Sequence, residues 1–355
     1  MVRLLELFGG IGACSKALER CGIDYEIADY VEIDKYAVKS YNAIHGTRFE
    51  PQDITQWDKN IKVDLIMHGS PCQDFSIAGN NAGGDKGSGT RSSLMYETIR
   101  IVKKLNPQIV IWENVKNLLS KKHKHNFNDY VEQMQALGYT NQFKVLNSSK
   151  YGIPQNRERV FVVSIREQYI SFAFPKEMPL KLCLKDVLEP VVDKKYYLSN
   201  AIVSKVLNSD FRQEHQRIQH KECCDTLLSS DYKHIKLTKI KTVGNYMPSK
   251  HEASRIVDSN GIAPTVKENH GTVTAVAETF SREKECLVTR KLTPLEYWRL
   301  MGFDDEDFKA AAKVNSDTQL YKQAGNSIVV NVLCEIVRQL RFALEEKNGG
   351  TDNNI

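Results

Sequence analysis

Residues 1 to about 165 alternate short apolar runs with segments of helical periodicity. Short apolar runs separated by helices predict buried strands in a mainly parallel sheet, and therefore an α/β fold. Ligands of such sheets bind beyond the carboxyl ends of the strands, where Phe8, Glu32, Cys72 and Glu113 fall. The strand-like runs lie at 2–7, 25–31, 63–68, 109–112 and 159–165, and the helix-like segments at 13–21, 35–45, 94–105 and 127–137.

The alternation is lost between about 186 and 290, where the chain is polar and rich in lysine. β-branched pieces at 235–238 and 272–274 predict a separate, irregular domain that contains β-structure. Six lysines and arginines stand against two acids between 231 and 255. This bias is typical of a phosphate-facing surface, but a solvated face explains it at least as well. Helix-like stretches follow at 293–301 and 327–345, and a frayed tail is expected at 346–355.

The composition is that of an ordinary globular protein. With 355 residues, 41% of them hydrophobic, the chain is long enough for two domains, or for one large domain with an insertion. No signal-like segment opens it and no apolar stretch reaches membrane-spanning length, so we expect a cytoplasmic protein. The net charge of +5 is mild, so a polyanion would have to meet a local patch. Eight cysteines without CxxC or Cys/His zinc spacing predict reduced thiols and no metal site.

A glycine-rich turn, Phe8-Gly9-Gly10-Ile11-Gly12, follows the first strand and opens a helix. Its glycines let backbone approach a ligand at a helix N-terminus, which indicates a nucleotide-like ligand. The dinucleotide fingerprint G-x-G-x-x-G fails at Ser15, which disfavours NAD. Glu32 could accept from ribose hydroxyls and Asp53 from an adenine amino group. Either acid alone is more often a surface carboxylate, and only their spacing favours the ligand.

Cys72 follows another apolar run, within Gly69-Ser70-Pro71-Cys72-Gln73. Pro71 fixes φ just before the thiol, and the small residues around it allow a tight turn that keeps the sulfur reachable. This placement is typical of a nucleophile, although an inert buried cysteine is the better expectation for an arbitrary intracellular thiol.

Six motifs, taken in order along nearly the whole chain, resemble those of the DNA (cytosine-5) methyltransferases of bacteria and phages. Ala13 departs from the family pattern where a further glycine is frequent, and Asp74 departs where a small uncharged residue is usual. The motifs are Phe8-Gly9-Gly10-Ile11-Gly12, Pro71-Cys72-Gln73, Glu113-Asn114-Val115, Gln155-Asn156-Arg157-Glu158-Arg159, Arg290-Lys291-Leu292-Thr293-Pro294 with Arg299-Leu300-Met301-Gly302-Phe303, and Gly325-Asn326-Ser327-Ile328-Val329-Val330-Asn331-Val332.

The resemblance implies the S-adenosylmethionine-dependent methyltransferase fold, a mostly parallel sheet with flanking helices, plus a smaller irregular β-containing target-recognition domain. We expect the catalytic domain at 1–185 and the recognition domain with its hinge at 186–319. A C-terminal helix at 320–345 would complete the catalytic domain, followed by the tail.

The same resemblance assigns catalytic roles. Cys72 would add to C6 of cytosine and make the ring an enamine, and Glu113 would hold a proton at N3. Arg159 would donate to the base O2, while Arg157 would support Cys72 or its loop. Both arginines could instead form a strand-edge ion pair with Glu158. Asn114 would orient the loop that carries Glu113 and Pro71, and Gln73 belongs to the catalytic set.

The methyl donor implied by the resemblance is S-adenosyl-L-methionine. Phe8 would stack on the adenine, with Glu32 on the ribose, Asp53 on the adenine amine and Asn326 near the methionine end. The full set expected at the donor is Phe8, Gly10, Gly12, Glu32, Ile33, Asp53, Ile54, Pro71, Asn326 and Ser327.

The implied partner is double-stranded DNA, from which the target base must be flipped out to reach the pocket. The glycine-rich run 80–91 suits a lid over bound DNA, or is simply a floppy loop. Thr265 resembles the family's element beside the flipped nucleotide, and Arg255 could contact phosphate or guanine. Ser76 and Arg91 complete the residues expected to contact DNA.

Two other functions remain open from the sequence. The same chemistry could act on RNA, although a basic stretch among about a hundred residues between Arg159 and Arg290 fits a duplex-spanning domain better. A catalytically inactive DNA-binding homologue would have no use for the full set of Cys72, Glu113, Arg157 and Arg159. We expect a cytoplasmic monomer, bacterial or phage-encoded and associated with the nucleoid, and a cognate restriction endonuclease acting separately is a candidate partner. The target DNA sequence is not readable.

Overall fold

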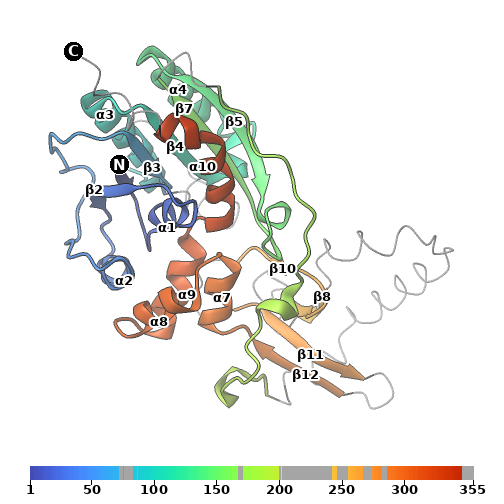
Figure 1. Ribbon diagram of the computed structural model, residues 1–355. Coiled ribbons are helices and arrows are strands. Elements are labelled where there is room, and N and C mark those ends of the chain that lie inside the picture. The colour runs from blue at the N-terminus through green and yellow to red at the C-terminus, as the bar shows by residue number, and fades with distance from the viewer. Residues whose placement is uncertain are drawn as a thin grey trace.

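The computed structural model describes most of the chain (Figure 1). Three residues expected at the site, Cys72, Gln73 and Ser76, lie outside the described residues, as do Asp74 and the lysines of the basic stretch. The described residues are 1–71, 75, 83–85, 87–166, 171–199, 201, 242–245, 255–266, 273–281 and 286–345.

A six-stranded sheet in the order β2-β1-β3-β4-β7-β5 forms the centre of the N-terminal half. Its first four strands are parallel, and β7 runs antiparallel to both β4 and β5. The α/β fold with a mostly parallel sheet is therefore confirmed, with an antiparallel pair at one edge. The bounds are β1 Val2–Leu7, β2 Tyr25–Val31, β3 Leu65–His68, β4 Ile109–Val115, β5 Thr140–Asn147 and β7 Glu158–Ile165.

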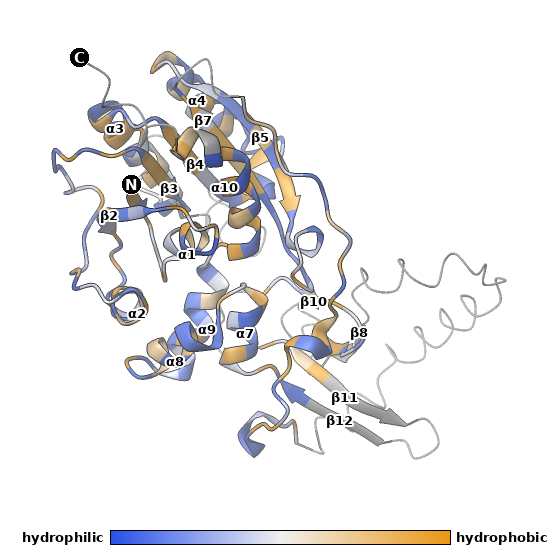
Figure 2. Cartoon of the chain, in the orientation of Figure 1, coloured by the Kyte–Doolittle hydropathy of each residue, from blue (hydrophilic) through white to orange (hydrophobic). Residues whose placement is uncertain are grey.

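Strand β5 is absent from the sequence expectation. It lies at the sheet edge, and most of its side chains are exposed or half-buried, so it carries no apolar run. Figure 2 shows its polar residues in blue. An edge strand needs apolar side chains only where it meets the core. Its hydrophobic pattern in the sequence is therefore weak.

Helices cover both faces of the sheet. Successive side chains of a strand point to opposite faces, and both faces carry apolar residues that must be buried. Residues of α3 and α4 share one buried cluster with Leu5, Ile66 and Val110. Residues of α1 and α10 share the other with Leu4 and Met67. The helices are α1 Ala13–Arg20, α2 Lys35–His45, α3 Met95–Leu105, α4 Lys124–Ala136 and α10 Val330–Glu345, with short 3-10 helices η1 Arg91–Leu94, η2 Lys116–Leu119 and η3 Ser148–Lys150.

A second, four-stranded sheet in the order β12-β11-β9-β8 lies beyond the first (Figure 1). It contains β8 Thr242–Asn245, β9 Arg255–Asp258, β11 Ala275–Ser281 and β12 Cys286–Lys291. The short strand β10 Ala263–Pro264 does not belong to this sheet but pairs with β6 Gln155–Asn156, next to the start of β7. Two further 3-10 helices precede this region, η4 Leu184–Val187 and η5 Lys194–Tyr196.

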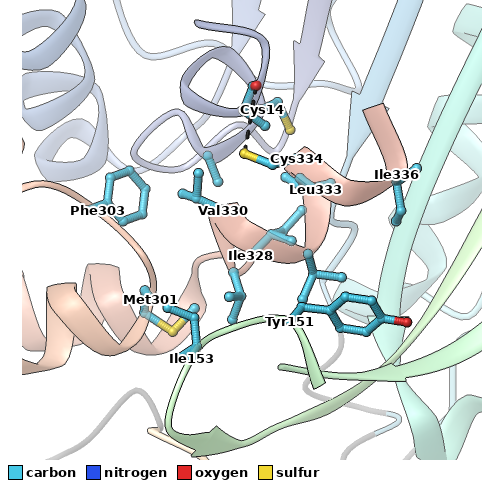
Figure 3. Packing of buried hydrophobic residues seen from close by; sticks show 14 of the residues in the cluster. Cys14, Tyr151, Ile153, Met301, Phe303, Ile328, Val330, Leu333, Cys334 and Ile336 are labelled. Atoms are coloured by element: carbon cyan, nitrogen blue, oxygen red, sulfur yellow. Dashed lines mark hydrogen bonds between the residues drawn. The ribbon is translucent and has the colours of Figure 1, made fainter. Parts of the chain in front are cut away.

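Three helices connect the second sheet to α10, namely α7 Pro294–Leu300, α8 Asp305–Ala312 and α9 Asp317–Asn326. They pack onto the cluster of α1 and α10, and Figure 3 shows Ile328 and Val330 near Met301 and Phe303 there. The buried ammonium of Lys16 in α1 pairs with Asp307 in α8 at 3.0 Å.

The domain boundaries expected from the sequence stay a prediction. Among the described residues, no helix is long and apolar enough to cross a membrane.

A fully buried ion pair joins β12 to α7. Nη2 of Arg290 lies 2.7 Å from Oε1 of Glu296, and neither side chain is exposed. Glu296 also accepts from the backbone N–H groups of Thr293 and Glu189, and Thr293 caps α7 in return. The motif Arg290-Lys291-Leu292-Thr293-Pro294 is thus the structural junction that starts α7.

We expect Glu296→Gln to lower the free energy of unfolding by about 3–5 kcal/mol, because the charge of Arg290 would remain buried without its counter-ion. The exposed pair Glu306 and Lys309 offers a matched control, since Glu306→Gln should cost less than about 1 kcal/mol. Urea unfolding followed by tryptophan fluorescence measures both. Equal midpoints for the two variants would contradict the structural role of the buried pair.

Candidate functional site

A cavity of about 650 Å³ lies beyond the carboxyl ends of β1, β2, β3 and β4. Parallel strands bring their carboxyl ends to one edge, so residues distant in sequence meet there. The helix α9 and the start of β7 supply the remaining walls. Its lining includes Phe8, Gly10, Glu32, Ile33, Asp53, Ile54, Pro71, Arg91, Glu113, Arg157, Arg159 and Asn326, all expected at the site from the sequence.

The glycine-rich turn reaches the cavity through Phe8 and Gly10, both with positive φ, 53° and 56°. A Cβ on Gly10 would meet no atom within 4 Å, so the backbone there is open to a ligand. Gly12, with φ 84°, is different, because a Cβ would lie 2.1 Å from Nε2 of His45. Gly12 does not line the cavity, and the space beside it is filled by the packing of α2.

Glu32 stands at the end of β2 with its carboxylate fixed by backbone donors. Oε2 accepts from Gly10 N–H at 3.1 Å, and Oε1 accepts from Asp34 N–H at 2.8 Å. Burial raises the pKa of this carboxyl, and the two backbone N–H groups oppose that shift. Each oxygen keeps a second lone pair, so the group can also accept from ligand hydroxyls.

Three more residues expected at the donor line the cavity with different exposure. Ile33 is 68% exposed although apolar, whereas Ile54 is buried. Asp53 is exposed, and its Oδ1 accepts from the backbone N–H and the hydroxyl of Thr55, both at 2.9 Å. An apolar side chain exposed at a cavity rim is suited to contact a flat ligand.

Asn326 and Ser327 end α9 on the opposite wall. Asn326 is exposed and lines the cavity. Ser327 is buried, does not line it, and donates from its hydroxyl to Ile328 C=O at 3.2 Å. The structure thus brings Asn326 to the cavity but leaves Ser327 behind its wall.

Glu113 and Arg159 form an ion pair inside the cavity. Nε of Arg159 lies 3.1 Å from Oε1 of Glu113, close enough for attraction but not aligned as a hydrogen bond. Burial raises the pKa of Glu113, and the positive charges of Arg159 and Arg157 oppose that shift. Glu113 therefore binds a proton more readily than an exposed glutamate does.

Arg157 is buried and holds three segments together. Its guanidinium donates to Val266 C=O at 3.0 Å, Gly325 C=O at 3.2 Å and Ser327 C=O at 2.8 Å. Glu158, the alternative partner expected at the strand edge, pairs with Lys116 at 3.0 Å. The guanidinium is instead fixed by backbone carbonyls of the cavity wall.

Asn114 links the end of β4 to the loop that precedes Cys72. Its Nδ2 lies 3.3 Å from Ser70 C=O and 3.2 Å from the Ser70 hydroxyl, and its Oδ1 accepts from Val115 N–H. The side chain is buried and does not line the cavity.

The residues expected to contact DNA are dispersed. Arg91 begins η1 and lines the cavity, whereas Arg255 begins β9 and does not. Thr265 follows β10, and its hydroxyl donates to Asn156 C=O at 2.7 Å, next to Arg157.

Gln155 strengthens this junction between Thr265 and Asn156 by accepting from Val266 N–H at 3.0 Å and donating to Leu300 C=O at 2.7 Å. The 263–266 segment is thus attached to β6, directly before Arg157.

Several lining residues were missed by the sequence reasoning. Lys322 of α9 pairs with Asp34, the N-cap of α2, at 3.0 Å across the cavity. The helix α9 carries no long apolar stripe, so its lining residues Gln319 and Lys322 gave no signal. The signal for Asp34 was its place two residues after Glu32. The missed residues are Val31, Asp34, Lys35, Tyr36, Gln52, Gly69, Ser70, Leu94, Gln319, Lys322 and Gly325. The described residues contain no cluster of three or more His, Cys, Asp or Glu that could hold a metal ion.

Known proteins resemble this chain over almost its whole length. It is 33% identical to the type II methyltransferase M.HhaI of Haemophilus parahaemolyticus, over 98% of this chain and 96% of that protein. It is 32% identical to the type II methyltransferase M2.ScrFI of Lactococcus lactis subsp. cremoris, over 96% and 99%. The crystal structure of S. pombe Dnmt2 methyltransferase shares the fold, with a TM-score of 0.66, 19% identity and coverage of 98% and 99%.

The family described as C-5 cytosine-specific DNA methylase matches residues 2–341. Members of this family use S-adenosylmethionine as methyl donor. With the cavity, the glycine turn and the Glu113–Arg159 pair in one place, the chain belongs to the C-5 cytosine-specific DNA methylases.

Proposed function

We propose that this chain transfers a methyl group from S-adenosyl-L-methionine to C5 of a cytosine in a specific double-stranded DNA sequence. The observation that carries the proposal is the single cavity that contains Phe8, Glu32, Glu113 and Arg159 and is also lined by Pro71, the residue before Cys72. A donor site and a base site that share one cavity can bring a methyl group and a pyrimidine together.

The donor half of the cavity fits an adenosyl group. Glu32 offers lone pairs to ribose hydroxyls, while Phe8 and Ile33 offer apolar surface to the adenine. Gly10 leaves its backbone open, and Asn326 on the opposite wall would meet the methionine end. When bound, S-adenosylmethionine supplies an electrophilic methyl group.

The base half supports covalent activation of cytosine. Cys72 would add as a thiolate to C6, and the electrons of the C5–C6 double bond would move so that C5 becomes nucleophilic. Glu113 in its protonated form would hold a proton at N3, and Arg159 would donate to O2. After methyl transfer, loss of the C5 proton restores the double bond and expels Cys72.

The DNA duplex must release its target base into the cavity by flipping. Thr265 is attached to Asn156 beside Arg157, so the segment that carries it lies next to the base half. Arg91 lines the cavity and is suited to a DNA phosphate. We further infer that the chain acts as a monomer, with any cognate restriction endonuclease as a separate protein.

Cys72→Ala should abolish methyl transfer while DNA binding persists, because the substitution removes the nucleophile and leaves the rest of the cavity intact. Bisulfite sequencing of DNA from cells that express each variant measures the transfer and also identifies the target sequence. Cys183→Ala is the matched control, since Cys183 is a buried cysteine that does not line the cavity and should keep activity. Retained methylation by Cys72→Ala would contradict the proposed mechanism.

Glu113→Gln should slow formation of the covalent adduct at least about a hundredfold, because glutamine can donate a hydrogen bond to N3 but cannot deliver a proton. The adduct is measured on denaturing gels with duplex DNA that contains 5-fluorocytosine. Glu158→Gln alters an exposed carboxylate on the same strand as Arg159 and should keep the wild-type rate. A wild-type rate in Glu113→Gln would exclude the proton-donor role.

A further inference from the structure

The buried hydroxyl of Ser70 receives two hydrogen bonds from the residues on either side of Glu113. Nε1 of Trp112 donates at 2.9 Å and Nδ2 of Asn114 at 3.2 Å. Ser70 is 3% exposed, and Trp112 and Asn114 are each 1% exposed. Two donors directed at one buried acceptor fix its position more closely than a single bond can.

The geometry of a strand explains why these donors flank Glu113. Successive side chains of β4 point to opposite faces, so Trp112 and Asn114 share one face and Glu113 lies on the other. Glu113 and Ser70 both line the cavity. A Cβ on Gly69 would lie 3.6 Å from Oε2 of Glu113, so the backbone before Ser70 passes close to the carboxyl. The loop and the acid are therefore held by three consecutive residues of one strand.

Packing fixes the indole that donates to Ser70. The rings of Trp112 and Tyr130 have centroids 4.0 Å apart, and the His68 ring is parallel to the indole within 5° at 5.8 Å. His68 and Tyr130 are joined in turn by a hydrogen bond of 3.0 Å. The Trp112 N–H consequently has little freedom to follow Ser70 if the loop shifts.

A second anchor lies just beyond the nucleophile in the sequence. Nδ2 of Asn117 donates to Phe75 C=O at 2.6 Å, and the Phe75 ring is fully buried. A Cβ on Gly84 would lie 2.4 Å from this ring, so the ring is closely packed. Cys72 is thus the first of three residues that lie between two anchored positions in the sequence. Before Pro71, Ser70 is hydrogen-bonded to β4, and after residue 74, Phe75 is hydrogen-bonded to η2.

We propose that Ser70 is a positioning residue, whose hydroxyl, held by Trp112 and Asn114, sets the distance between Pro71 and Glu113. The inference rests on the proposed function, because it concerns how the nucleophile and the proton donor are brought into register. Ser70 touches neither the base nor the donor in this role. It acts through the backbone that leads to Cys72, where a small displacement lowers the rate of attack.

The test uses the full chain and long duplex DNA, synthesised with 5-fluoro-dCTP and designed to contain every short target sequence. Single-turnover adduct formation is followed with S-adenosylmethionine present, together with the dissociation constant of S-adenosylmethionine and the melting temperature. Ser70→Ala should slow adduct formation by about tenfold, in line with the loss of a buried hydrogen-bonded group. The affinity for S-adenosylmethionine should stay within about twofold, because Phe8, Glu32, Asp53 and Asn326 are untouched and only Pro71 of the expected donor set adjoins Ser70.

Trp112→Phe removes the N–H donor and keeps an aromatic ring, so it should slow the adduct in the same direction. If both residues act through their shared hydrogen bond, the rate loss of Ser70→Ala with Trp112→Phe will be smaller than the product of the two single losses. Where Ser70→Ala fails to fold, Trp112→Phe carries the test, and an unchanged adduct rate in it overturns the proposal.

Ser164→Ala is the matched control. Ser164 is a buried serine of β7 whose hydroxyl donates to Asn141 Oδ1 at 2.6 Å, and it does not line the cavity. It should lower the melting temperature without slowing the adduct. If Ser70→Ala and Ser164→Ala lower the melting temperature equally and both form the adduct at the wild-type rate, Ser70 has only a structural role and the proposal is overturned. Absence of any adduct with the wild-type chain would instead refute the proposed function, so the two failures are distinguishable.

Discussion

The buried guanidinium of Arg157 is the interaction on which the cavity depends. It donates to carbonyls of Val266, Gly325 and Ser327, two of which lie more than 160 residues further along the chain. A buried cation is tolerated only when its donors are paired, and these carbonyls would in turn lose their partner without it. One side chain therefore joins the junction of β6 and β7, the segment after β10 and the end of α9.

The central strands and most helices could be predicted because burial on both faces leaves long apolar runs, as in 109–112 and 159–165. The strand β5 and the helices α8 and α9 could not, because each is partly exposed and needs apolar residues on a narrow face only. Their placement follows from tertiary contacts, such as Lys16 with Asp307, which join residues that no local pattern connects.

At the site, the sequence predicted which residues end the strands but not how each is used. Gly10 and Gly12 look alike in the sequence, yet only Gly10 faces the cavity, because His45 packs against Gly12 from another helix. Arg157 and Arg159 also look alike, but one side chain binds carbonyls and the other pairs with Glu113. Arg157 lies between β6 and β7 whereas Arg159 lies within β7, and the partners of both side chains come from distant segments.

Two buried acids of the central sheet, Glu6 and Glu113, lower the stability of the fold when they ionise. Burial raises the pKa of Glu6, in β1, to about 7, and hydrogen bonds from Ser15 and Tyr41 only partly oppose it. Burial also raises the pKa of Glu113. An acid whose pKa is higher in the folded state binds more protons there than in the unfolded chain, so its contribution to stability falls as pH rises from about 4.5 through the folded pKa. A carboxyl whose pKa is raised by burial thus destabilises the surrounding fold once it ionises, and the buried aromatic and aliphatic clusters on both faces of the sheet must offset that cost.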